Sequence, residues 1–229
     1  MLHKWEEPCI CYGEGAGTIF FSGCNLHCVY CQNAEISRGA HGEKMSEDAL
    51  TDKIFELERS GASCIEFVTP THYTDRLVNI LKKIKHKLKI PVVWNSGGYE
   101  KTETLKALTG LVDIYMPDLK YFYAESGEKY SHAPDYFPVA ISAIKEMISQ
   151  VGQPQLDPDG RMSRGVIVRH LVLPGCRGES AELLRALAKE LPDTKQILIS
   201  LMSQYTPDFY VENHPDCKYK NLTRRLTSF

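Results

Sequence analysis

Apolar residues along this chain alternate between short compact runs and longer segments with a helical repeat. The short runs are rich in β-branched and aromatic residues, and they predict strands at residues 18–22, 64–69, 90–95, 112–116, 166–173 and 196–201. Apolar residues spaced three and four apart predict helices from residue 46 onward and at residues 75–89, 102–109, 133–151 and 179–191. Ser46, followed by two acidic residues, is a good N-cap for the first of these helices.

This alternation of strand and helix determines the expected fold class. Strands joined through helices imply a parallel sheet with right-handed crossovers. Six such units fall short of the eight in a closed barrel, so we predict an α/β fold, an open partial (β/α)6 TIM-like barrel. No Gly-rich linker divides the chain, so residues 1–229 are expected to form a single domain. Residues 206–229 are then a C-terminal tail, which either is a shortened closing element or leaves the barrel incompletely closed.

Composition and charge exclude several classes of protein. Hydrophobic residues make up 43% of the chain, which is enough for a core and excludes a disordered chain. The 27 basic and 29 acidic residues nearly cancel, which argues against nucleic-acid or membrane-surface partners. No apolar run approaches the roughly 20 residues of a membrane helix, and residues 1–7 do not resemble a signal peptide. We therefore expect a cytoplasmic protein.

The distribution of cysteines indicates a metal centre. Five of the eight cysteines lie within the first 31 residues. Cys24, Cys28 and Cys31 form a Cys-x3-Cys-x2-Cys loop directly after the first predicted strand. Thiolates select zinc, Cu(I) or iron–sulfur clusters, but structural zinc needs four ligands and haem attachment needs a histidine where Gln32 stands. Three thiolates would leave one iron of a four-iron cluster open for chemistry.

The loop GCNLHCVYCQN resembles the signature of the radical S-adenosylmethionine (SAM) superfamily, Cys-x3-Cys-x-aromatic-Cys, with Tyr30 as the aromatic residue. The further runs VTPTHY, WNSGGYE, DIYMPDLKY and VRHLVLPG make the chain similar to an uncharacterised branch near pyruvate formate-lyase activating enzyme. This resemblance extends from about residue 7 to about residue 207 and implies a partial (β/α)6 barrel. It implies that Cys24, Cys28 and Cys31 hold a [4Fe–4S] cluster, and that Tyr30 lies against SAM.

The resemblance also implies a reaction. The open iron would chelate the amino and carboxylate groups of SAM. An electron from the reduced cluster would cleave SAM into methionine and a 5′-deoxyadenosyl radical, which then abstracts hydrogen from a substrate.

Several polar residues at the predicted strand ends are candidate SAM contacts. Where the family usually has Gly-Gly-Glu, this chain has Thr69 and Thr71, whose hydroxyls and neighbouring carbonyls can accept from the SAM ammonium group. A helix-capping turn is the alternative interpretation of Thr71. The end of the third strand carries Asn95 and Ser96, which the family would use for the ribose or methionine portion. Gln204, after the sixth strand, is a candidate contact to adenine or ribose.

Three charged residues complete the candidate site. Asp118 and Lys120 resemble the Asp-Leu-Lys segment of activating enzymes. That resemblance implies that Asp118 orders the site, alone or with a monovalent cation, and that Lys120 is a catalytic residue reaching SAM or substrate. An ordinary surface ion pair is the alternative. Arg169 lies inside an apolar strand and needs a partner, either the SAM carboxylate or an internal salt bridge to Asp118. His170 should face the opposite side and be packed.

Activation of a glycyl radical enzyme is the function that the resemblance favours, because six units leave little chain to cover the barrel mouth. A flavodoxin- or ferredoxin-type protein would supply the electron. Three alternatives stay open: radical SAM modification of a small molecule or peptide, a non-catalytic iron–sulfur redox or sensor protein, and a zinc-stabilised domain in which Cys9 or Cys11 completes the ligand set.

Overall fold

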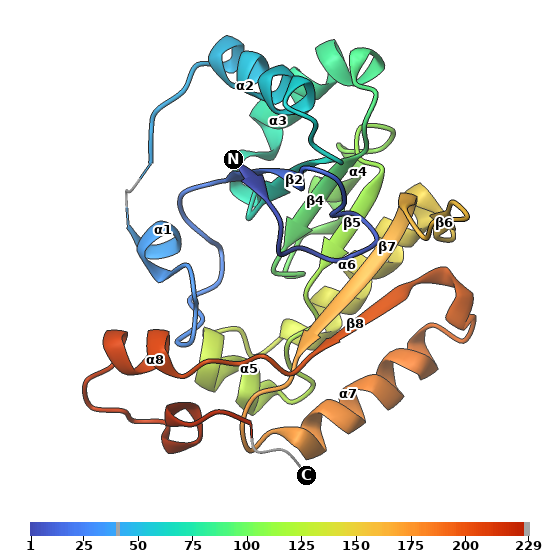
Figure 1. Cartoon of the computed structure of the whole chain (residues 1–229). Helices are drawn as coiled ribbons and strands as arrows, with labels where there is room; N and C mark the ends of the chain where they lie inside the picture. Colours follow the sequence, from blue (N-terminus) through green and yellow to red (C-terminus); the bar gives the residue numbers. More distant parts are fainter. Residues whose placement is uncertain (40–41, 227–229) are drawn as a thin grey trace.

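The computed structural model describes residues 1–39 and 42–226. Within these residues, six parallel strands form a curved open sheet (Figure 1). Their order is β2 (Ala16–Phe20), β3 (Ile65–Val68), β4 (Val92–Ser96), β5 (Ile114–Pro117), β7 (Met162–Leu171) and β8 (Leu198–Met202). Two short strands, β1 (Leu2–His3) and β6 (Gln155–Leu156), pair antiparallel with β2 and β7. The predicted open partial barrel is therefore confirmed.

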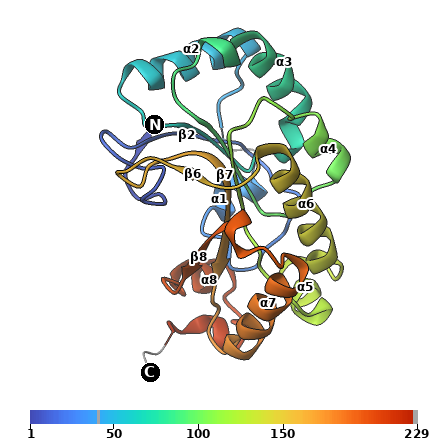
Figure 2. The same cartoon turned by 90° about the vertical axis from the view of Figure 1, so that its right-hand side faces the viewer.

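The predicted helices lie on the convex side of this sheet (Figure 2). They are α2 (Glu47–Arg59), α3 (Thr74–Ile84), α4 (Thr102–Lys106), α6 (Tyr136–Val151) and α7 (Arg177–Glu190). The N-cap assigned to Ser46 is confirmed, since its side chain accepts a hydrogen bond from the Ala49 backbone NH. Helix α3 is shorter than predicted. The chain continues from α3 into a 3-10 turn, η2 (Lys85–Lys87), before the extended residue Leu88 leads toward β4.

The sequence pattern missed several short elements. These are α1 (Ala34–Arg38), α5 (Ala124–Ser131), α8 (Asp208–Asn213) and the 3-10 turns η1 (Thr71–Tyr73), η3 (Thr194–Gln196) and η4 (Lys220–Thr223). Elements of this length span too few turns for a 3.6-residue period to be visible. The tail from residue 206 carries α8 and η4 and packs through the buried side chains of Tyr210 and Leu222. Its last three residues lie outside the described part.

Alternation along each strand separates two apolar layers. Side chains such as Trp94, Tyr115 and Val168 pack outward against the helices, whereas Val93, Ile114 and Ile167 face the concave side. Residues 9–11 of the N-terminal segment enter the concave side, where Ile10 and Cys9 join this inner layer. Because the inner layer occupies the beginnings of the strands, the polar positions lie toward their carboxyl ends, where barrel enzymes place their sites.

No helix in the described part combines the length and the apolar character that a membrane span requires.

Candidate functional site

The three-cysteine loop begins directly after β2 and is fixed at its start by His72. The Nε2 atom of His72 lies 2.6 Å from the Ser22 carbonyl oxygen, so this ring nitrogen is the donor. Gly23 adopts φ +90°, and a Cβ there would lie 3.0 Å from the same Nε2 atom. The Gly23 NH in turn donates to the Ile36 carbonyl at 3.0 Å. His72 therefore positions the turn into Cys24.

The second half of the loop is clamped by elements that the sequence did not predict. The Val29 NH donates to the Tyr130 carbonyl of α5 at 2.9 Å, and His214, just after α8, places its Nε2 atom 2.8 Å from the Val29 carbonyl. Arg38 at the end of α1 donates to the Cys28 carbonyl at 2.7 Å. The short helices thus hold a segment that has no regular structure of its own.

The three thiols of this loop interact electrostatically and are only partly exposed. Burial raises the pKa of Cys24 and of Cys28, while the nearby ammonium group of Lys120 opposes that increase. Ser131 donates a hydrogen bond to the Cys28 Sγ at 2.9 Å. A cationic side chain and a hydroxyl donor beside sulfur stabilise the thiolate, which is the form of cysteine that ligates a metal, so these residues fit an iron–sulfur cluster bound by three thiolates.

The remaining cysteines do not join this group. All eight cysteines lie in the described part and are free thiols. Cys9 packs in the inner apolar layer, and the Cys11 Sγ donates to the His3 carbonyl at 3.3 Å. Cys64 is buried. Within residues 1–39 and 42–226, no three His, Cys, Asp or Glu side chains are arranged to hold one metal ion.

Asp118, Lys120 and Arg169 meet at the carboxyl ends of β5 and β7. The Asp118 carboxylate accepts from Lys120 Nζ at 2.5 Å and from Arg169 Nε at 3.1 Å. These side chains are only 16–19% exposed, so the pair is not a surface ion pair, and the internal salt bridge expected for Arg169 is present. Burial opposes both charges, but the two cations outweigh it and lower the pKa of Asp118. The carboxylate in turn raises the pKa of Lys120 despite burial. Lys120 is therefore a fixed cation.

Asn95 extends this network across the sheet to a glutamate that sequence reasoning missed. Asn95 accepts from Arg169 Nη2 at 2.9 Å and donates to Glu66 Oε1 at 2.7 Å. Thr18 donates to the other oxygen of Glu66 at 3.0 Å. Glu66 is fully buried in β3. A charged residue inside the run CIEFVT carries the same signal that singled out Arg169, and it could have been found by the same argument.

Glu6 reaches the same arginine from the N-terminal segment. Its Oε1 atom lies 3.2 Å from Arg169 Nη1, and its side chain is 12% exposed. Burial, followed by the charge of nearby Glu66, raises the pKa of Glu6 to about 7. The folded protein thus holds the proton of the Glu6 carboxyl group more tightly than the unfolded chain does. The free energy of unfolding therefore falls as pH rises from about 4.5 to about 7.

We expect Glu6→Gln to remove this pH dependence. The wild type should lose about 2 kcal/mol in the free energy of unfolding between pH 5 and pH 8 that the variant keeps, because the variant has no carboxyl group to ionise at position 6. Urea unfolding at both pH values measures the difference. Glu14→Gln is the matched control, since Glu14 is exposed and lies 3.9 Å from Lys4. Equal pH slopes in wild type and Glu6→Gln would contradict the expectation.

Two of the predicted SAM contacts lie in a different cluster. Thr71 donates to Glu100 Oε1 at 2.9 Å, and Ser96 donates to Glu100 Oε2 at 2.7 Å. Trp94 also donates to Oε1, at 3.0 Å. Glu100 is buried, and burial raises its pKa. Because side chains alternate along β4, Ser96 joins Trp94 on the outer face, opposite Asn95. The structure therefore brings Asn95, but not the hydroxyls of Thr71 and Ser96, to Asp118 and Arg169.

The other predicted contacts, Thr69, Tyr30 and Gln204, differ in their surroundings. Thr69 has φ +56° at the end of β3, a strained conformation for a β-branched residue, and its NH donates to the Asn95 carbonyl at 2.9 Å. Tyr30 is buried, with its hydroxyl oxygen 2.7 Å from that of Tyr121. Gln204 is exposed at the mouth. His170 is buried on the opposite face, as expected, between the Leu119 carbonyl and Ser180.

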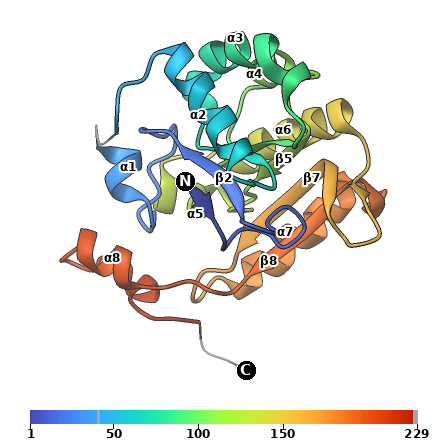
Figure 3. The same cartoon turned by 45° about the horizontal axis from the view of Figure 1, so that its top comes forward.

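Two adjoining cavities occupy the concave side. One, of about 240 Å³, is lined by residues that include Cys28, Cys31, Asp118 and Lys120. The other, of about 530 Å³, extends between the N-terminal segment and β8, and both cavities share Arg169 and Gln204 among their lining residues. Figure 3 shows the N-terminal segment lying within the curve of the sheet. The cysteine loop and the charged network therefore face two adjoining cavities.

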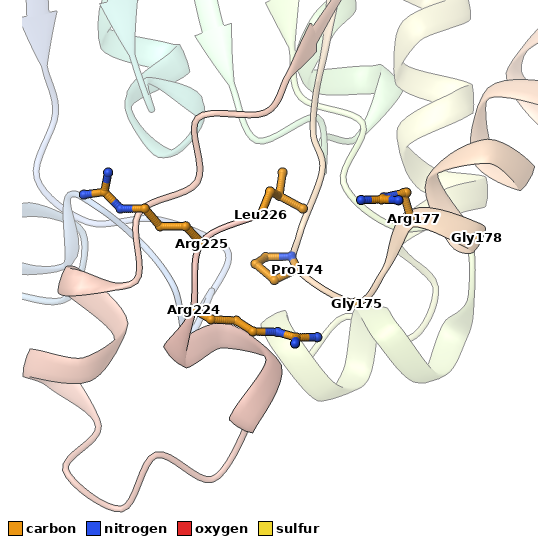
Figure 4. Close-up of a pocket in the computed structure, with 7 residues that line it drawn as sticks. All are labelled: Pro174, Gly175, Arg177, Gly178, Arg224, Arg225 and Leu226. Atoms are coloured by element: carbon orange, nitrogen blue, oxygen red, sulfur yellow. The ribbon is translucent and has the colours of Figure 1, made fainter. Parts of the chain in front are cut away.

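A separate cavity of about 300 Å³ lies at the N-terminus of α7 (Figure 4). Its lining includes Arg177, Arg224 and Arg225. Arg225 points away from the other two in Figure 4, and it lies 4.0 Å from Asp208. These arginines do not converge on one point, and none of the predicted site residues lines this cavity.

Comparison with known sequences identifies a related family and a related protein. Residues 11–122 match the family described as a 4Fe-4S single cluster domain. An uncharacterized protein of Methanocaldococcus jannaschii is 32% identical over 236 residues, covering 99% of this chain. The chain spans 62% of that relative's length. The family match begins at Cys11 and includes the whole cysteine loop.

Solved structures share the fold at low sequence identity. Streptococcus suis SuiB bound to the precursor peptide SuiA aligns with a TM-score of 0.55 and 14% identity, covering 82% of this chain and 40% of that chain. A variant of spore photoproduct lyase with bound AdoMet and dinucleoside spore photoproduct aligns with a TM-score of 0.55 and 14% identity, covering 90% and 62%. SuiB bound to S-adenosylmethionine gives a TM-score of 0.52 at 12% identity, covering 87% and 49%. At this sequence identity, these structures show only that the chain shares their fold.

Proposed function

We propose that this chain is a radical SAM enzyme with a [4Fe–4S] cluster, a placement that the 4Fe-4S family match and the SAM-bound structural neighbours support. Cys24, Cys28 and Cys31 would hold the cluster. When bound, the reduced cluster supplies the electron that cleaves SAM to methionine and a 5′-deoxyadenosyl radical. The observation that carries the proposal is the cavity in which Cys28 and Cys31 face Asp118, Lys120 and Arg169.

The residues around this cavity have complementary roles in the proposal. Lys120 and Arg169 are cations held in place by Asp118, and they would attract the carboxylate group of SAM. Arg169 already donates through Nη1 to a carboxyl group, that of Glu6, which is the same kind of group that SAM would present. Lys120 keeps its proton, so its proposed catalytic role is to orient an anionic group rather than to act as a base. We also propose that a monovalent cation binds beside Asp118 and helps it to order the site.

For the substrate and the reductant of this enzyme, we propose that the hydrogen donor is a glycyl radical enzyme and that a flavodoxin- or ferredoxin-type protein supplies the electron. The resemblance of Asp118-Leu119-Lys120 to activating enzymes supports the first part. The second cavity supports it too, because it reaches from Arg169 to the exposed Gln204 and could admit a loop of another protein.

Anaerobic reconstitution tests both levels of the proposal. We expect the reconstituted protein to bind iron and sulfide and, when reduced by dithionite, to convert SAM into 5′-deoxyadenosine. Absence of 5′-deoxyadenosine from cluster-loaded protein would contradict the enzyme assignment. Purified pyruvate formate-lyase is the first probe for the activase role. A glycyl radical signal by EPR would support that role, and 5′-deoxyadenosine without this signal would count against it.

A second candidate is modification of a small molecule or peptide. The cavity of about 530 Å³ is within the usual size range of small-molecule sites. Its lining combines Glu6, Glu7 and His3 with Arg169, a polar set that could orient a substrate through hydrogen bonds. If 5′-deoxyadenosine formation rises on addition of a peptide but not of pyruvate formate-lyase, this second candidate is favoured.

A further inference from the structure

Three hydroxyl groups form a buried chain that ends on one of the cluster cysteines. The hydroxyl oxygens of Tyr30 and Tyr121 lie 2.7 Å apart, and Tyr121 Oη lies 2.6 Å from Ser131 Oγ. Ser131 is the last residue of α5, and its hydroxyl lies 2.9 Å from the Cys28 Sγ. The side chains of Tyr30, Tyr121 and Ser131 are all at most 8% exposed. We call these three side chains the hydroxyl chain.

The Cys28 sulfur at the end of the hydroxyl chain determines the direction of every hydrogen bond in it. A cysteine that ligates iron is a thiolate, which only accepts hydrogen bonds, so Ser131 must give its single proton to the Cys28 sulfur. Ser131 is then an acceptor toward Tyr121, and Tyr121 must in turn be an acceptor toward Tyr30.

We propose that the hydroxyl chain raises the reduction potential of the cluster bound at Cys28, with Ser131 as the donor and the two tyrosines as positioning residues behind it. The inference rests on the proposed cluster. Reduction adds negative charge to a cluster and its sulfurs, and a hydrogen bond donated to sulfur stabilises the reduced state more than the oxidised one. Donors aligned in one direction polarise one another, so the outer hydroxyls strengthen the last bond.

The surroundings of the hydroxyl chain explain why it is held in one geometry. The ring of Tyr121 stacks on Tyr130 at a centroid distance of 6.1 Å and meets Tyr136 edge-on at 5.3 Å. The carbonyl of Tyr130, adjacent to Ser131, also binds the Val29 NH in the cysteine loop. The end of α5 thus fixes both the backbone beside Cys28 and the donor to its sulfur. This donor, Ser131, lies outside the cysteine motif.

An EPR-monitored redox titration of the reconstituted protein tests the proposal. Ser131→Ala should lower the ratio of reduced to oxidised cluster at a fixed potential by about tenfold, which corresponds to a shift of about 59 mV for a one-electron couple. Tyr121→Phe should give a smaller decrease, since Ser131 still donates, and Tyr30→Phe the smallest. Tyr115→Phe is the matched control, because it removes a tyrosine hydroxyl that donates to Gln150 away from the cysteine loop.

The possible results separate this inference from the proposed function. Equal potentials for wild type, Ser131→Ala and Tyr121→Phe, at equal iron and sulfide content, would overturn the inference and leave the cluster assignment intact. Wild-type protein that binds no iron would overturn both. If Ser131→Ala fails to fold, the decrease in Tyr121→Phe against Tyr115→Phe decides the question, since a purely structural role would not move the potential of a cluster that is fully loaded.

Discussion

Cys28→Ala is expected to leave the reconstituted protein without a stable [4Fe–4S] cluster and, therefore, without 5′-deoxyadenosine production from SAM. Cys28 is central to the candidate site, because its sulfur lies in the cavity with Asp118 and Lys120 and accepts the Ser131 hydroxyl. With only Cys24 and Cys31 left, the loop has two thiolates, whereas an iron–sulfur cluster of this type needs at least three. Iron and sulfide analysis, visible absorbance and EPR after anaerobic reconstitution measure the loss.

Cys217→Ser is the matched control for this experiment. Cys217 is a free thiol with φ +44°, and serine fits that backbone no worse than cysteine does. It lies in the tail, outside the two cavities on the concave side. The control should bind as much iron as the wild type. A Cys28→Ala protein that keeps wild-type iron, sulfide and EPR signals would disprove the assignment of this cysteine as a ligand.

Arg169→Met is expected to lower the free energy of unfolding by about 3 kcal/mol at pH 8, since it leaves partly buried carboxylates without their shared cation. Arg169 joins Asp118, Glu6 and Asn95 through separate nitrogens, so the network loses three hydrogen bonds at once. Methionine keeps most of the apolar stem, which separates the charge effect from loss of packing. Urea unfolding of wild type and variant measures the difference.

The loss should be smaller below pH 6, because Glu6 can then take up a proton and no longer needs a cation. Arg225→Met is the control, since Arg225 forms an exposed ion pair 4.0 Å from Asp208, and such pairs contribute about 0–1 kcal/mol. If Arg169→Met is as stable as Arg225→Met at pH 8, the Arg169 network does not stabilise the fold in the way its contacts indicate.

The apolar pattern was sufficient to predict the framework of this protein. Each of the six parallel strands overlaps a predicted run, and α2 begins after the predicted cap at Ser46. These features depend on the spacing of apolar residues and on burial of one face of each element, and both can be recognised from consecutive residues. The boundaries are less accurate: α3 ends at Ile84 rather than continuing to residue 89, because the turn into β4 overrides the helical pattern.

Chemistry concentrated in one short segment could also be recognised in advance. Cys24, Cys28 and Cys31 lie within eight residues, so their spacing predicted a metal centre, and the resemblance to radical SAM enzymes implied a [4Fe–4S] cluster. The unusual position of Arg169 in an apolar strand likewise indicated a buried partner, and Asp118 is that partner. Glu66 carried the same signal and was overlooked. Thr71 and Ser96 were expected near SAM, but their hydroxyls bind Glu100, four residues after Ser96.

The sequence by itself determined which residues are able to act: it specified the strands, the cysteine loop and the charged side chains at the strand ends. Only the tertiary structure decided which partners those residues have. Glu6 meets Arg169 across 163 positions and Ser131 meets Cys28 across 103. The physical reason is that a hydrogen bond or ion pair depends on distances of about 3 Å, and distant segments reach that separation only through the packing of the whole barrel.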